Sequence, residues 1–166
     1  MNELVLAKIE EAEECGKLLE EGRQFQLANG FVQWTAKYPT SGDVENDIKE
    51  GTGYVYKIDG KIAAYMCIRK GIEPYYVKID GEWDSKEPYV VVHRMGLSDE
   101  FRGKGLTKEI FLAIEELSRK LGALSIRIDT HTPNKTMQHV LERCGFTYRG
   151  IVNYPQGTRL GYDKNI

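Results

Sequence analysis

The sequence has few of the features that mark exported, membrane-bound or metal-dependent proteins. Its amino terminus lacks both the basic segment and the apolar segment of a secretory signal, and no apolar run approaches the length that crosses a bilayer. Only three cysteines occur, Cys15, Cys67 and Cys144, an odd number without the spacing of a metal site. These absences predict a cytoplasmic protein in a reducing compartment, with small buried cysteines and no metal.

The chain also lacks an excess of either charge. It carries 23 Lys and Arg against 25 Asp and Glu, so it has no overall basic character of the kind that binds nucleic acid regardless of sequence. Its 166 residues, of which 41% are hydrophobic and 29% charged, are typical of one globular domain, and no repeat, low-complexity segment or linker is visible. We therefore expect a single domain over residues 1–166.

Strand-like and helix-like periods follow one another at the start of the chain. Residues 3–9 alternate as a short strand does. A Glu-rich helix is predicted next, and its apolar stripe is formed by Ala12, Cys15, Leu18 and Leu19. A further helical segment that stops at Pro39 is predicted from the spacing of Phe31, Trp34 and Tyr38.

A hairpin is the clearest local prediction of the first half. Residues 41–51 predict a helix that is capped by Ser41 or Asp43. Two alternating runs then meet at Asp59-Gly60, a pair that tolerates the positive φ angles of a tight turn and so predicts two antiparallel strands. Residues 71–88 have turn formers, aromatics and acids without a sustained period, and we interpret them as a long loop with a short irregular strand.

The second half predicts a strand, a crossover helix and a second strand, followed by a helix and two closing strands. Residues 89–97 and 123–130 are the two strands, and a parallel pair with a right-handed connection follows from this order. The crossover helix ends at Gly122 and buries the face formed by Leu106, Ile110, Ala113, Ile114, Leu117 and Leu121. The loop before this helix lies where open α/β sheets bind ligands.

That loop, residues 102–107, has the sequence RGKGLT and suggests an anion site. A Walker loop would need Ser or Thr directly after Lys104, where Gly105 stands. A dinucleotide fingerprint would need a third glycine at the position of Lys108. Two alternatives remain on composition alone, a short cradle for a pyrophosphate and a plain glycine-rich turn.

The order of elements around the loop resembles the GNAT superfamily of N-acetyltransferases over nearly the whole chain. The phosphate motif of that family is Arg or Gln, two residues, Gly, one residue, then Gly or Ala, and Arg102, Gly105 and Thr107 fall on these positions. The helix opening at Asn134 and the segment ending at Phe146 match as well. The resemblance implies an α/β (α+β) fold with a mixed sheet of about six or seven strands, splayed between strands four and five and flanked by about four helices.

The resemblance also implies acetyl-CoA as co-substrate and places its contacts. The pantetheine arm would pair with the backbone at Met95, Gly96 and Leu97. The pyrophosphate would lie on the loop formed by Arg102, Gly103, Lys104, Gly105, Leu106 and Thr107. Asn134 would reach the pantetheine, although a helix cap is an equal interpretation of an asparagine at this place.

Transfer of an acetyl group to an amine needs a base, because an alkylammonium has a pKa of about 10 and must lose its proton. His93 is the first candidate, since it lies four residues before Leu97 on the same strand, hence on the same face as Met95 and Leu97, and histidine titrates near neutral pH. A structural histidine within an apolar strand is the alternative. Glu87 is a competing base, as are Glu82 and Asp84, and all three acids are equally explained as solvated loop residues.

The departing thiolate needs a proton, and the tyrosine that the family often supplies for it is absent here. Leu141 occupies its position, which leaves water, Tyr148 or Tyr154 to act instead. The acceptor would lie against Trp34, Tyr38, Glu82 and Trp83, although aromatics at helical spacing are also typical of a core.

We therefore expect an acetyl-CoA-dependent N-acetyltransferase that acts on a primary amine of a small molecule or peptide by direct attack in a ternary complex. The alternative is a non-catalytic sensor or regulatory module that binds acyl-CoA. The expected partner is the amine acceptor, with no nucleic acid and no membrane, while a homodimer is left open and the sequence does not identify the amine.

Overall fold

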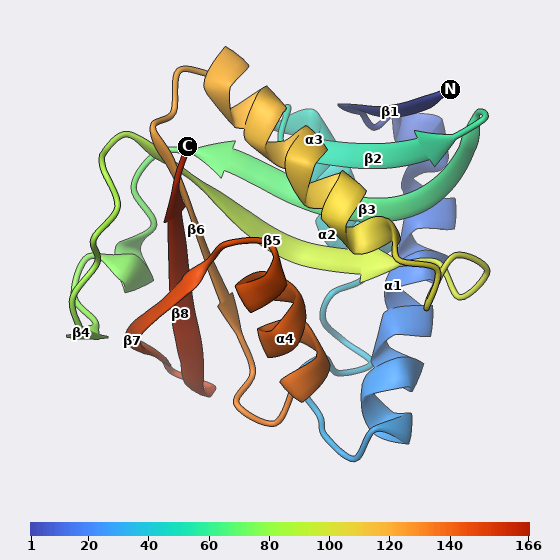
Figure 1. The fold of residues 1–166 in the computed structure, drawn as a ribbon. Helices are drawn as coiled ribbons and strands as arrows, with labels where there is room; N and C mark the ends of the chain where they lie inside the picture. The colour runs from blue at the N-terminus through green and yellow to red at the C-terminus, as the bar shows by residue number, and fades with distance from the viewer. The chain divides into compact units, whose positions relative to one another are not determined.

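The computed structural model describes residues 1–166 and has the mixed α and β architecture that was predicted (Figure 1). Four helices are present: α1 Ala12–Ala28, α2 Ser41–Lys49, α3 Leu106–Lys120 and α4 Lys135–Arg143. The strands are β1 Asn2–Leu6, β2 Gly53–Ile58, β3 Lys61–Lys70, β4 Asp80–Gly81, β5 Tyr89–Leu97, β6 Ser125–Thr130, β7 Thr147–Tyr154 and β8 Gly157–Asn165. The strand order in the sheet is β1-β2-β3-β5-β6-β8-β7-β4. The fold class is confirmed, and the eighth strand beyond the predicted count is the two-residue β4.

The chain divides into two compact units, each built from two separate stretches of the sequence. We call Met1–Ile68 together with His93–Ile110 the first unit, and Arg69–Val92 together with Phe111–Ile166 the second unit. No helix in either unit is both long enough and apolar enough to cross a membrane.

The first unit is built on the antiparallel strands β1, β2 and β3. The turn between β2 and β3 has Asp59 at φ 50° and Gly60 at φ 83°, which confirms the predicted hairpin. The apolar stripe of α1 and Val44 of α2 form one buried cluster with Val55, Ile62 and Tyr65 of the strands. This packing explains why an acidic, Glu-rich helix is stable here, because burial of one face and not intrinsic propensity holds it.

Two local predictions in the first unit are wrong. Residues 31–38 form turns and not a helix, since Trp34 has its ring against Gly22 of α1, and its backbone nitrogen donates to the side chain of Gln26 at 2.9 Å. The apolar period there comes from burial under α1. The cap of α2 is Thr40, whose backbone nitrogen donates to the carboxylate of Asp43 at 2.8 Å, so the helix begins one residue after its cap.

The second unit contains the start of β5 and the strands β6, β8, β7 and β4. Tyr89–Val91 of β5 pairs in parallel with Ser125–Arg127 of β6, as predicted. This ladder has only three residue pairs, although β5 continues to Leu97 and β6 continues to Thr130 in pairing with β8. The interruption falls where the resemblance placed the splay. The 71–88 loop is largely irregular, as predicted, with a short 3-10 helix at Pro74–Tyr76 besides β4.

Candidate active site

The glycine-rich loop of the first unit connects β5 to α3 and is drawn in yellow beyond the arrowhead of β5 (Figure 1). Gly103 and Gly105 have φ angles of 77° and 74°, in the left-handed region that favours glycine. No atom lies within 4 Å of a Cβ built at either position, so the backbone conformation and not crowding selects glycine. The loop therefore offers accessible backbone at the start of a helix, which is the arrangement that binds phosphate groups.

Arg102 makes contacts that the sequence did not reveal. Its Nη2 donates to the carbonyl oxygen of Leu97 at 2.7 Å and lies 3.0 Å from Oδ1 of Asp99, and its guanidinium lies 4.4 Å from the centre of the Phe25 ring. These three contacts fix the loop against α1 and the end of β5. Lys104, by contrast, is exposed and lies 6.0 Å from the ring of Phe101. Arg102 is thus placed to order the loop, while Lys104 is the cation that faces solvent.

The strand before the loop carries Met95, Gly96 and Leu97, with Met95 and Leu97 half-buried. A Cβ at Gly96 would lie 3.0 Å from a methyl carbon of Leu18 and 3.0 Å from one of Leu19. Glycine at this position lets α1 approach the strand closely, a packing reason that is independent of any ligand.

Arg94 interrupts the regular strand. It has φ 51°, a left-handed conformation that is uncommon outside glycine, asparagine and aspartate. Its guanidinium forms a salt bridge with Asp47 of α2, with Nη2 to Oδ1 at 2.5 Å, and its Nη1 donates to the hydroxyl of Tyr38 at 2.9 Å. Since one left-handed residue breaks the two-residue repeat of a strand, the argument that places His93 on the same face as Met95 does not hold across Arg94.

A carboxylate held by two tyrosines marks the second unit. Oδ2 of Asp129, at the end of β6, accepts from the hydroxyls of Tyr76 at 2.6 Å and of Tyr154 at 2.7 Å. Burial, and then the negative charge of Asp129, raises the pKa of both phenols above the ordinary tyrosine value. Both phenols therefore stay protonated at neutral pH, and each hydroxyl uses its hydrogen in the hydrogen bond to Asp129. The carboxylate itself forms no salt bridge.

The family model described as the acetyltransferase (GNAT) family matches residues 19–146 of the chain. The chain belongs to the GNAT acetyltransferase family. The match covers the glycine-rich loop and α4, which carry the resemblance seen in the sequence.

The chain is also similar to individual acetyltransferases. A crystal structure of a GNAT-family acetyltransferase from Streptococcus agalactiae 2603 is 33% identical, with a TM-score of 0.91 over 99% of this chain and 95% of that one. A Bacillus subtilis (strain 168) protein called uncharacterized N-acetyltransferase YesJ is 24% identical over 87% of this chain and 81% of its own. The aminoglycoside acetyltransferase AAC(6')-Ib, solved with coenzyme A and kanamycin, is 20% identical, with a TM-score of 0.71 over 99% of this chain and 95% of that one. This GNAT chain is an acyltransferase that uses acyl-CoA.

Two positions of the family pattern lie around α4 in the second unit. Asn134 is the cap of α4, and its Oδ1 accepts from the backbone nitrogen of Met137 at 3.1 Å. The cap interpretation is therefore correct, and the amide nitrogen of Asn134 has no partner within the protein and stays available to a ligand. Leu141, at the position of the missing family tyrosine, is fully buried and packs as a core residue.

The residues predicted to contact the acceptor lie in different environments. Trp34 is 9% exposed and belongs to the core cluster of the first unit, whereas Tyr38 is 46% exposed and accepts from Arg94. Trp83 is half-buried in the second unit, where its Nε1 donates to the carbonyl oxygen of Tyr76 at 2.8 Å. Glu82 is exposed. Trp83 is thus the predicted contact that the second unit brings beside the Asp129 cluster.

The candidate bases differ as well. His93 is half-buried on β5, and Glu87 is exposed just before β5. His131 follows β6 directly. Burial, and then the charge of Arg159, lowers the pKa of its imidazole below the ordinary 6.5. The neutral imidazole that results at neutral pH is the form that can accept a proton.

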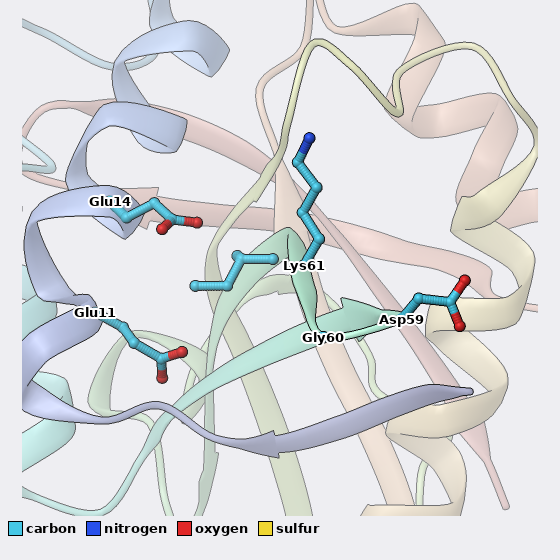
Figure 2. Close-up of a pocket in the computed structure, with 6 residues that line it drawn as sticks. Glu11, Glu14, Asp59, Gly60 and Lys61 are labelled. Carbon is cyan, nitrogen blue, oxygen red and sulfur yellow. The ribbon is translucent and has the colours of Figure 1, made fainter.

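An open pocket elsewhere in the first unit does not fit the chemistry. Glu11 and Glu14 face the hairpin there, whereas Asp59 points away from them (Figure 2). Three of its four charged side chains are already paired, Glu11 with Lys57 at 2.8 Å, Asp59 with the amino terminus and Lys61 with Glu100. It contains no glycine loop and no predicted site residue, so we do not assign a function to it.

Proposed function

We propose that this GNAT protein is an acetyl-CoA-dependent N-acetyltransferase that transfers the acetyl group to a primary amine of a small molecule or peptide by direct attack in a ternary complex. Acyl-CoA use follows from the family. The choice of an amine rests on one observation, the carboxylate of Asp129 that is held by two neutral hydroxyls and by no cation.

The Asp129 cluster fits a positively charged acceptor. Both hydrogen bonds of Asp129 reach Oδ2, which leaves Oδ1 without a partner in the protein. A negative charge without a cation attracts an ammonium group, and aromatic faces favour cations further. The ring of Tyr75, 42% exposed, lies 4.6 Å from that of Tyr154 and supplies such a face.

Tyr154 was predicted as a proton donor, and its contacts favour a different role. Its hydroxyl donates a hydrogen bond to Asp129, and its pKa is raised further above that of a thiol, which is about 8.5. Proton transfer from Tyr154 to the CoA thiolate would therefore run uphill. We assign Tyr154 instead to the acceptor, with its oxygen accepting a hydrogen bond from the ammonium while its own hydroxyl hydrogen stays in the hydrogen bond to Asp129.

The reaction is balanced without a dedicated acid. The ammonium first gives a proton to a base, for which His93 and Glu87 stay our candidates and neutral His131 is a third. The amine nitrogen then attacks the thioester carbonyl carbon, the new amide bond forms and the carbon–sulfur bond breaks. The CoA thiolate can leave without an acid because it is only weakly basic, the pKa of its thiol being about 8.5, and it takes up from the solvent the proton that the base has released.

Asn134 and the loop from Arg102 to Thr107 would hold the co-substrate. The backbone of Gly103, Lys104 and Gly105 would receive the pyrophosphate, and the free amide of Asn134 would donate to the pantetheine arm. A sensor that binds acyl-CoA without turnover is the second candidate, favoured by the burial of Leu141 where the family often has a tyrosine.

A two-part measurement tests the proposal. Acetyl-CoA at about 100 times its dissociation constant should raise the free energy of unfolding by about 2.7 kcal/mol, and a panel of amines should include at least one that releases CoA thiol. The Asp129→Asn variant keeps the shape of the carboxylate and should lower kcat/KM for a cationic amine by about 30-fold, equivalent to about 2 kcal/mol. Binding without turnover on any amine would favour the sensor, and an unchanged kcat/KM in Asp129→Asn would remove this cluster from the acceptor site.

A further inference from the structure

Arg94 lies in the middle of strand β5 and has a positive φ angle, a left-handed conformation that favours glycine. Asp59, in the β2–β3 turn, is the other non-glycine residue with positive φ, and it occupies a place where such angles are expected. Arg94 lies inside β5, where a left-handed residue is unfavourable for any side chain with a Cβ. Such a conformation persists only where the surrounding structure holds it, and it is most often found at functional sites.

The side chain of Arg94 provides that hold. All three guanidinium nitrogens are bound: Nε to Oδ2 of Asp47 at 3.0 Å, Nη2 to Oδ1 of Asp47 at 2.5 Å, and Nη1 to the hydroxyl of Tyr38 at 2.9 Å. Asp47 is 4% exposed and also accepts from the hydroxyl of Tyr65 at 2.5 Å. We call this set of contacts among Arg94, Asp47, Tyr38 and Tyr65 the clamp. It joins β5 to α2, to β3 and to the 31–40 segment, all within the first unit.

The place of Arg94 in the chain gives this clamp a purpose. The next three residues, Met95 to Leu97, are the stretch along which the family resemblance places the pantetheine arm, and the carbonyl oxygen of Leu97 accepts from Arg102 of the loop. A left-handed residue in a strand removes its peptide from the regular ladder and turns the backbone that follows. The direction of the Met95–Leu97 backbone thus depends on the conformation at Arg94.

We propose that Arg94 is a positioning residue for acyl transfer. Its side chain, bound by Asp47 and Tyr38, holds the backbone of Arg94 in the left-handed conformation, and this conformation places the backbone donors of β5 against the thioester. This inference rests on the co-substrate site proposed above. Arg94 acts through the backbone and does not itself touch the acyl group. Backbone donors that are fixed in advance are what a developing oxyanion requires, and a small misplacement of such donors is costly to the rate.

A purely structural ion pair is the competing explanation, and glycine separates the two. Arg94→Gly and Arg94→Ala remove the same guanidinium and leave Asp47 in the same state. Glycine enters the left-handed region freely, whereas alanine does not. If the conformation matters, the glycine variant should have the higher kcat, by about 5- to 30-fold over alanine. Arg94→Asn, which tolerates the left-handed region better than alanine, should fall between them.

The rate measurement needs a companion that is independent of the acceptor. The carbonyl carbon resonance of [1-13C]acetyl-CoA, recorded on the bound co-substrate, should be close to that of the wild type in Arg94→Gly and should move toward the free value in Arg94→Ala. Melting temperatures of the two variants, measured in parallel, report the loss of the ion pair and should be lowered in both. A role in stability alone moves the melting temperature and not the carbonyl resonance.

Each outcome supports or overturns the inference. Equal kcat and equal carbonyl resonance in Arg94→Gly and Arg94→Ala overturn it, as does a glycine variant slower than alanine. Should both single variants fail to fold, the same comparison is made in Asp47→Asn/Arg94→Gly and Asp47→Asn/Arg94→Ala, which remove both charges together. A wild-type protein that does not bind acetyl-CoA at all would instead overturn the proposed function, and that result is visible before any variant is made.

Discussion

Each unit has one aspartate to which we assign a role, and the two aspartates differ in whether a cation neutralises the carboxylate. Asp47 of the first unit is paired with the guanidinium of Arg94 and accepts from one tyrosine. Asp129 of the second unit accepts from two tyrosines and has no cation. The first charge is neutralised inside the protein, while the second is only solvated by hydroxyl groups. A neutralised carboxylate is suited to hold backbone in place, and a carboxylate without a counter-ion is suited to attract a cationic ligand.

Removal of one negative charge at a time should separate these two roles most strongly in the free energy of unfolding. Asp47→Asn leaves the guanidinium of Arg94 without its carboxylate in a largely buried place and should cost about 3 kcal/mol. Asp129→Asn strands no charge and weakens hydrogen bonds only, so we expect about 1 kcal/mol or less. Urea denaturation of both variants measures the difference. A larger loss at Asp129 than at Asp47 would show that the comparison is drawn the wrong way round.

The two cations of the glycine-rich loop should also differ, one acting through fixed contacts and the other through its exposed charge. Replacement of either one should weaken acetyl-CoA binding by about 1 kcal/mol. Arg102 stacks on Phe25 and binds the carbonyl of Leu97, contacts that lysine does not reproduce, so Arg102→Lys should bind as weakly as Arg102→Ala. Lys104 is exposed, and the loss in Lys104→Ala should shrink as salt is raised. Calorimetric titrations at two salt concentrations test both. Full binding by Arg102→Lys would mean that only its charge is used.

The smallest expected effect is on the pH dependence of stability in the second unit. Because the pKa of His131 is lowered in the folded protein, the unfolded chain takes up a proton more readily as the pH falls below about 6.5. The free energy of unfolding should therefore decline over this range, down to the folded pKa, and the decline should be shallower in His131→Gln. The exposed His139→Gln serves as a matched control. Equal slopes in wild type and His131→Gln would remove His131 as the source.

The hairpin and the crossover unit could be predicted because their signals are local. Asp59-Gly60 specifies its own turn, and the Leu and Ile spacing after residue 105 specifies its own helix. The segment from Phe31 to Tyr38 was misjudged because its period reflects burial of Trp34 against Gly22, a contact made across a turn. Periodicity reports which residues are buried, and it identifies a helix only when the helix itself causes the burial.

The candidate site was only half visible in the sequence. The glycine-rich loop stands as one short motif, but Tyr76 and Asp129 are 53 positions apart and no local pattern connects them. Asp47 did leave a signal, because it shares a helix face with Val44 and Ile48, and a charge on an apolar face calls for a partner. Arg94 left no such signal, because nothing in a run of strand-forming residues predicts that one of them has a left-handed backbone conformation.

The contact between Gly22 and Trp34 limits how the protein can be engineered. Alanine in place of glycine within a helix usually stabilises a protein, by roughly 0.5–1 kcal/mol. At Gly22 of α1 the added carbon would lie 2.7 Å from Cζ3 of Trp34, inside the space that the indole already fills. A stabilisation programme that selects helical glycines from the sequence would include this position, and the substitution would displace the indole ring that packs against the helix.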